Sequence, residues 1–131
     1  MKLAATTRIM VVDDDVDLDE TYKLILESDG FSVETFDNPF GALEAFRQKP
    51  EDTFDLMLID LDMLGMNGAE LYREMMNSNK KMPNVCFITG YPTFYDILKE
   101  SFPEIDVRCF IRKPVDKDEL LIHIKNEINK R

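Results

Sequence analysis

Two patterns of apolar and polar positions alternate along this chain. Short runs of apolar, β-branched and aromatic residues are followed by longer stretches in which apolar residues recur at helical spacing. The short runs are typical of strands, which are expected at residues 8–12, 31–36, 54–59, 85–89 and 107–112. A helix is expected after each of these strands, so the chain reads as successive strand–helix units.

Capping residues and prolines indicate where the helices begin and end. Gly30 marks the end of the first helix, and Pro39 stands in the first turn of the second. The apolar spacing predicts that the second helix buries Phe40 and that the fourth buries Ile97. The helices are expected at residues 15–29, from 37 or 38 onwards, from 67 onwards, between 92 and 103, and at 116–130.

Several of the expected strands are almost continuously apolar, as strands covered on both faces should be. Consecutive strand–helix units joined by right-handed crossovers form an α/β, doubly wound parallel sheet. In such sheets the functional crevice lies at the carboxyl ends of the strands. The residues that directly follow each strand are therefore the first candidates for function.

Length and charge narrow the possibilities further. The 131 residues fit a single domain, expected over residues 1–131 with its core at about 8–130. A net charge of −10 argues against nucleic acid or an anionic membrane as a partner. The apolar runs are much shorter than the ~20 residues of a membrane span, and residues 1–7 do not resemble a signal peptide. A soluble, cytoplasmic protein is expected.

Cys86 and Cys109 are the only cysteines, too few for a disulfide scaffold. Both lie in apolar segments. We therefore expect both to be reduced and buried, each acting as a small hydrophobic side chain.

Chemically active side chains follow four of the expected strands. Carboxylates that gather at one rim repel one another unless a cation neutralises them, and oxygen ligands suit Mg²⁺. A carboxylate beside such a cation can attack phosphorus and form an acyl phosphate, provided that nearby positive charge meets the phosphoryl oxygens. The candidates are Asp13, Asp14 and Asp15 after the first strand, Asp60 and Asp62 after the third, Thr89 after the fourth and Lys113 after the fifth.

Some of these residues also have purely structural interpretations. Asp15 and Asp17 are expected to cap the first helix or to favour its positive end. His123, the only histidine, is expected to be an ordinary residue of the last helix. For Asp60 a structural role is less attractive, because it ends an apolar strand and would otherwise be a partly buried, unpaired charge.

The segments at residues 11–15, 54–68, 87–90 and 110–114 resemble, in this order, the signature segments of response-regulator receiver domains. The resemblance covers the chain from about residue 8 to its end. It implies a flavodoxin-like (βα)5 fold with strand order 2-1-3-4-5. It also implies a single receiver domain without an output domain, acting as a phosphorylation-controlled switch and not as a turnover enzyme.

By this resemblance Asp60 is the phosphoacceptor, and Lys113, before a cis peptide to Pro114, pairs with a phosphoryl oxygen. Thr89 and Phe110 are the switch residues, and the strand alternation places Phe110 on the face opposite Cys109. The resemblance also implies a Mg²⁺ or Mn²⁺ ion held by Asp13, Asp14, Asp60 and the backbone carbonyl of Asp62. Asp62 and Tyr91 occupy positions that tune the lifetime of the phosphoryl group.

The resemblance also implies binding partners. The phosphoryl donor would be a sensor histidine kinase or a phosphotransfer protein. A downstream protein or a second copy of the chain would bind at the surface of the fourth helix, fifth strand and fifth helix. One departure is Leu64, which stands where the family usually has proline and is expected to loosen the loop after Asp60.

Two other functions remain open from the sequence. Asp60 and Asp62 also resemble the first motif of haloacid dehalogenase-like phosphatases, but in those enzymes the metal-binding acidic pair comes last, whereas Asp13 and Asp14 come first. A receiver that only binds partners, without being phosphorylated, is the other alternative.

Overall fold

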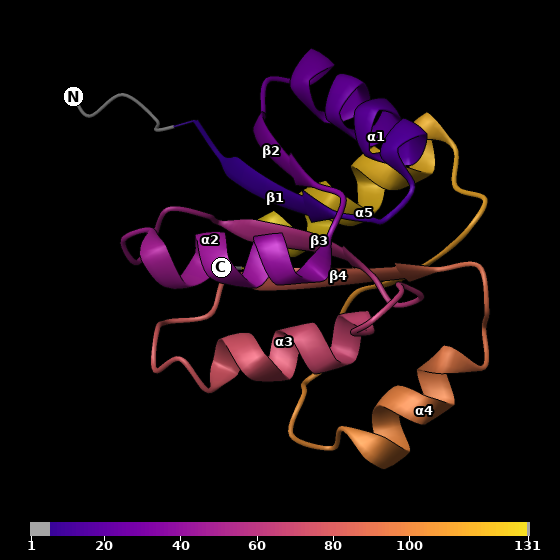
Figure 1. Ribbon diagram of the computed structural model, residues 1–131. Helices are drawn as coiled ribbons and strands as arrows, with labels where there is room; N and C mark the ends of the chain where they lie inside the picture. Colours follow the sequence, from indigo (N-terminus) through magenta and orange to yellow (C-terminus); the bar gives the residue numbers. More distant parts are fainter. Residues whose placement is uncertain (1–5, 131) are drawn as a thin grey trace.

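A parallel sheet of five strands forms the centre of the molecule, in the order β2-β1-β3-β4-β5. The computed structural model describes residues 6–130 (Figure 1). The expected fold class and strand order are confirmed. The strands are β1 (Arg8–Val12), β2 (Ser32–Phe36), β3 (Leu56–Asp60), β4 (Asn84–Thr89) and β5 (Phe110–Arg112).

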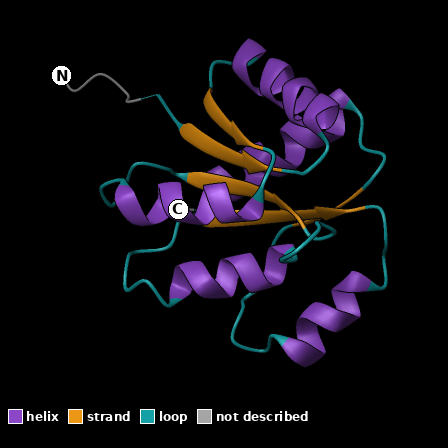
Figure 2. Cartoon of the chain, viewed as in Figure 1, coloured by secondary structure: helices purple, strands orange, loops and turns teal. Residues whose placement is uncertain are grey.

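Helices cover both faces of the sheet (Figure 2). α1 and α5 enclose one apolar cluster, which contains Tyr22, Leu26 and Ile124, while α2, α3 and α4 enclose the other. In the described part of the chain, none of the helices combines the length and apolar character needed to cross a membrane. The helices are α1 (Val16–Ser28), α2 (Pro39–Gln48), α3 (Gly68–Met76), α4 (Phe94–Ser101) and α5 (Lys117–Asn129).

Side-chain caps set the starts of α1, α2, α3 and α5 near the carboxyl edge of the sheet, whereas α4 begins without one. The Asp15 carboxylate accepts hydrogen bonds from the backbone N–H groups of Asp17 and Leu18, which confirms its structural role. At α3, Asn67 and Glu70 form a reciprocal capping box with distances of 2.8 and 3.0 Å. These caps hold the helix starts firmly against the loops that carry the candidate site.

Three expectations about packing were wrong. Phe40 is 54% exposed and Ile97 is 43% exposed, so neither is buried by its helix. The Phe40 ring lies instead against Gly65 in the β3–α3 loop. β5 is also shorter than the expected strand, because only Phe110–Arg112 pair with β4, at Phe87–Thr89. An apolar pattern therefore shows neither how much of each side chain its neighbours cover nor how far an edge strand finds hydrogen-bonding partners.

The two cysteines are joined by a disulfide bond, which corrects the expectation that they are reduced. The parallel register pairs Phe87 with Phe110, and it therefore places Cys86 beside Cys109, with Cα atoms 4.6 Å apart. Both residues are buried, as expected. The pairing could not be read from the sequence, because it depends on the register of two strands separated by a helix.

Candidate functional site

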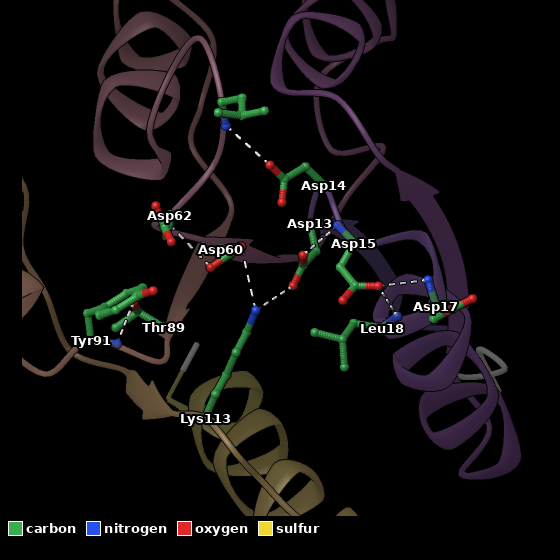
Figure 3. A network of polar contacts seen from close by, with 11 residues as sticks. Asp13, Asp14, Asp15, Asp17, Leu18, Asp60, Asp62, Thr89, Tyr91 and Lys113 are labelled. Carbon is green, nitrogen blue, oxygen red and sulfur yellow. Dashed lines mark hydrogen bonds and ion pairs between the residues drawn. The ribbon is translucent and has the colours of Figure 1, made fainter.

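The carboxyl ends of four strands bring the predicted site residues together (Figure 3). Asp13 follows β1, Asp60 ends β3, Thr89 ends β4 and Lys113 follows β5. One carboxylate oxygen from each of Asp13, Asp14 and Asp60 lies within 4.8 Å of the others. These hard oxygen donors from two loops fit a divalent cation such as Mg²⁺.

Lys113 lies between the two buried carboxylates of this cluster. Its Nζ donates a hydrogen bond of 2.9 Å to Asp13 Oδ2 and lies 3.5 Å from Asp60 Oδ2. Burial by itself lowers the pKa of Lys113, but the hydrogen bond to Asp13 and the charge of Asp60 raise it overall. Lys113 is therefore a fixed positive charge beside Asp60. The peptide bond that follows it, to Pro114, is cis, as expected.

Asp60 is only 3% exposed, and its environment disfavours a negative charge. Burial and the charge of Asp13 raise the pKa of Asp60 to about 7, against the lowering effects of Lys113 and of the Asp62 N–H group. That N–H donates to Asp60 Oδ1 at 3.2 Å. The ionised carboxylate thus lacks sufficient compensating charge within the protein, and a cation at this cluster would supply it.

The loops after β1 and β3 are tied together by a contact that the sequence did not predict. The backbone N–H of Leu64 donates to Asp14 Oδ2 at 3.2 Å, while the Leu64 side chain is exposed. A proline at this position has no N–H and could not make the bond. The departure at Leu64, expected to loosen the loop, instead adds a hydrogen bond to a carboxylate of the acidic cluster.

Gly68, the first residue of α3, packs directly on the end of β3. A Cβ atom at this position would lie 2.4 Å from the Asp60 carbonyl oxygen and 2.9 Å from Ile59 Cγ2. Only glycine therefore allows α3 to begin so close to the candidate phosphoacceptor. The sequence signal was a glycine at a helix start, where other residues form helices better.

The two candidate switch residues lie on neighbouring strands. Thr89 is buried, and its Oγ1 accepts a hydrogen bond of 3.1 Å from the backbone N–H of Tyr91, whose side chain is exposed. Phe110 is half-buried on the face opposite Cys109, as expected. Its ring meets that of Tyr95 on α4 edge to face, with centroids 5.2 Å apart. Phe110 therefore connects β5 with α4.

Asp19 on α1 is a buried carboxylate that sequence reasoning missed. It is 3% exposed, and among the described residues its Oδ1 finds no hydrogen-bond partner. Burial, followed by the charges of Asp13 and Asp37, raises the pKa of Asp19 to about 8. Its spacing from Tyr22 and Leu26 puts it on the buried stripe of α1, and this spacing was the signal in the sequence.

The comparisons with known proteins agree with this geometry. Residues 9–125 match the response regulator receiver domain. The phosphoglycerate transport system transcriptional regulatory protein PgtA of Salmonella typhimurium is 32% identical over 94% of this chain and 28% of its own length. The CpxR homolog of Haemophilus influenzae is also 32% identical, over 91% of this chain and 49% of its own. The chain thus spans about half or less of these two relatives.

Solved structures with the same fold include other receiver domains. One from Clostridium thermocellum has a TM-score of 0.81 and 27% identity, covering 95% of each chain. The response regulator TrrA of Thermotoga maritima, solved in complex with Mg²⁺–BeF, has a TM-score of 0.77 and 26% identity, covering 92% of this chain and 98% of its own. The fold and these matches thus define a signalling switch module. The chain belongs to the receiver domain family of two-component response regulators.

Proposed function

We propose that this domain accepts a phosphoryl group on Asp60 from the phosphohistidine of a sensor histidine kinase or a phosphotransfer protein. The observation that carries the proposal is the position of Lys113 Nζ, 2.9 Å from Asp13 and 3.5 Å from Asp60, at the rim where three carboxylates meet. A permanent positive charge beside a buried carboxylate is what an incoming phosphoryl group requires.

A divalent cation fits the same cluster. Asp13, Asp14 and Asp60, with the backbone carbonyl of Asp62, would hold Mg²⁺ or Mn²⁺. When bound, the cation supplies positive charge that neutralises the carboxylates and the phosphoryl oxygens. The raised pKa of Asp60 supports this assignment, because the ionised form needs more positive charge than Lys113 provides.

The chemical step is a transfer between two nucleophiles. A carboxylate oxygen of Asp60 forms a bond to phosphorus as the phosphorus–nitrogen bond of the donor breaks, and the electron pair of that bond remains on the imidazole. Lys113 pairs with a phosphoryl oxygen. Thr89, which ends the neighbouring strand, turns its hydroxyl towards another phosphoryl oxygen.

The movement of Thr89 gives the site its output. A Thr89 hydroxyl that binds the phosphoryl group no longer faces the Tyr91 N–H in the same way, so the β4–α4 loop shifts. Phe110 follows inwards, and its contact with Tyr95 transmits the change to α4. The surface of α4, β5 and α5 is then remodelled for a downstream protein or a second copy of the chain.

Two positions beside the site are proposed to set the lifetime of the acyl phosphate. The side chains of Asp62 and Tyr91 are both exposed, and each lies two positions after a site residue, Asp60 or Thr89. In this position they act on the access of water to the phosphoryl group. Substitution of either residue is expected to change the rate of dephosphorylation more than the rate of phosphoryl uptake.

Intact-protein mass after incubation with acetyl phosphate tests the proposal. The expected result is a gain of one phosphoryl group that requires Mg²⁺ and is absent in Asp60→Asn. Asp62→Asn should still take up the phosphoryl group and differ only in how fast it is lost. No adduct under any condition would indicate a module that only binds partners. Continuous hydrolysis of the donor without a lasting adduct would indicate a phosphatase.

A further inference from the structure

The Cys86–Cys109 disulfide joins the two strands that carry the candidate switch residues. Cys86 lies on β4, which ends at Thr89, and Cys109 directly precedes Phe110, the first residue of β5. The sulfur atoms lie in the apolar cluster with Ile124 of α5. Phe110 points to the opposite face of the sheet. The bond therefore lies beside the switch without contacting the phosphoacceptor chemistry.

The start of β5 has few other attachments to the sheet. β5 is a three-residue edge strand that pairs only with β4. Just before it, the Cys109 carbonyl accepts a bond of 3.0 Å from the Phe87 N–H, and just after it the Lys113 N–H donates to the Thr89 carbonyl at 2.8 Å. A covalent link at Cys109 fixes the backbone next to Phe110 more strongly than these hydrogen bonds do.

The position of the pair also determines how a reagent reaches it. Cys86 is fully buried in a central strand, whereas Cys109 is 6% exposed and lies beside the edge strand. Opening of this edge exposes Cys109 before Cys86. Exchange is therefore expected to be slow and to begin at Cys109.

We propose that Cys86 and Cys109 form a reversible dithiol–disulfide pair, and that the disulfide limits the movement of β5 in response to phosphorylation. The second half of this proposal rests on the proposed function. In the disulfide form, phosphoryl uptake at Asp60 proceeds as in the reduced form, but the α4–β5–α5 surface changes less. The domain then transmits its signal fully only when the two thiols are free.

The oxidising step is an exchange with a small-molecule disulfide such as glutathione disulfide. The thiolate of one cysteine attacks a sulfur of that molecule, releases one thiol and leaves a mixed disulfide. The other cysteine attacks the protein sulfur of this intermediate, forms the Cys86–Cys109 bond and releases the second thiol. The protein loses two electrons, the added disulfide gains them, and both protein protons end on the released thiols.

The first experiment tests the pair without any phosphorylation. The full chain is equilibrated with mixtures of reduced and oxidised glutathione and then denatured in an alkylating reagent that modifies every free thiol. The intact mass then gives the number of alkylated cysteines. A shift from two alkylated cysteines to none as the oxidised fraction rises is expected, and reversal by reductant completes the cycle. Two alkylated cysteines at every ratio would overturn the proposal, as would a bond that no reductant opens in the folded protein.

The second experiment tests the effect on the switch. Amide chemical shifts are recorded for the oxidised, the reduced and the Cys86→Ala/Cys109→Ala protein, before and after addition of Mg²⁺ and beryllofluoride. The changes at Phe110 and Tyr95 should be larger in the reduced protein and in the double variant than in the oxidised protein. Equal changes in all three would overturn the limiting role of the bond.

The two proposals fail in different ways. Intact mass after acetyl phosphate is measured on the same three samples, with Asp60→Asn as the control for the acceptor. No adduct in any sample would refute the acceptor role of Asp60. The glutathione titration would still test the dithiol–disulfide pair, because it does not depend on phosphorylation. An adduct in the reduced sample alone would contradict the claim that the bond spares phosphoryl uptake.

Discussion

Neutralising Asp60 should stabilise the folded protein, although the residue is proposed to be the centre of its chemistry. Burial and the charge of Asp13 raise the pKa of Asp60 from its ordinary 3.8 to about 7. The folded state therefore favours the protonated side chain. Asp60→Asn removes the cost of ionising this side chain and keeps nearly the same shape.

The size of the effect follows from the pKa shift. Each pKa unit corresponds to about 1.4 kcal/mol, so a rise from 3.8 to about 7 corresponds to about 4 kcal/mol. The folded pKa is raised, so the stability contributed by the protonated group is complete below pH 3.8 and is lost as the pH rises through 7. The variant should therefore exceed the natural protein by about 4 kcal/mol above pH 7 and by little near pH 4.

Urea unfolding followed by circular dichroism measures the difference, in buffer with a chelator so that no cation compensates the charge. Asp62→Asn is the matched control, because it removes an equal charge from an exposed side chain two positions away and should change the stability little. Equal stability of the Asp60→Asn variant and the natural protein at pH 8 would refute the reasoning. A pH-independent gain would do so as well, because it would not come from ionisation. Added Mg²⁺ should stabilise the natural protein and narrow the gap.

Three further predictions concern contacts that only the folded chain shows. Gly68→Ala should lower the free energy of unfolding by about 1–3 kcal/mol, because its Cβ would lie 2.4 Å from the Asp60 carbonyl oxygen. The control Gly41→Ala, on the open side of α2, should raise the free energy of unfolding by up to about 1 kcal/mol. Urea unfolding measures both variants, and a stabilising effect of Gly68→Ala would contradict the close contact. Leu64→Pro removes the N–H that donates to Asp14 and so frees that carboxylate oxygen for the cation; titration calorimetry should show Mg²⁺ binding tightened by about fivefold. The control Leu64→Ala keeps the N–H and should keep the Mg²⁺ affinity. Weaker Mg²⁺ binding by the proline variant would show that the hydrogen bond favours the cation site. Reduction of the disulfide, whose cysteines are 23 residues apart, should lower the free energy of unfolding by about 3 kcal/mol through loop-closure entropy. Urea unfolding with and without a reductant measures this difference, and an equal unfolding midpoint in both conditions would argue against the bond.

The fold and most of the site could be predicted from local patterns. Helix starts at Asn38 and Asn67 follow from capping chemistry, which acts over a few residues and is therefore readable in a single sequence. The alternation of strands and helices leads to a parallel sheet, and a parallel sheet gathers the residues after its strands at one edge. For this reason the sequence alone predicts that Asp13, Asp60 and Lys113 lie close together.

Contacts between distant segments were decided by the tertiary structure alone. The Cys86–Cys109 bond depends on the register of β4 and β5, and the hydrogen bond from Leu64 to Asp14 depends on how two loops approach each other. Asp19 is buried because α1 packs against the sheet beside a cluster of carboxylates. Periodicity determines which face of an element avoids water, but the partner of each side chain is set by the packing of elements far apart in the chain.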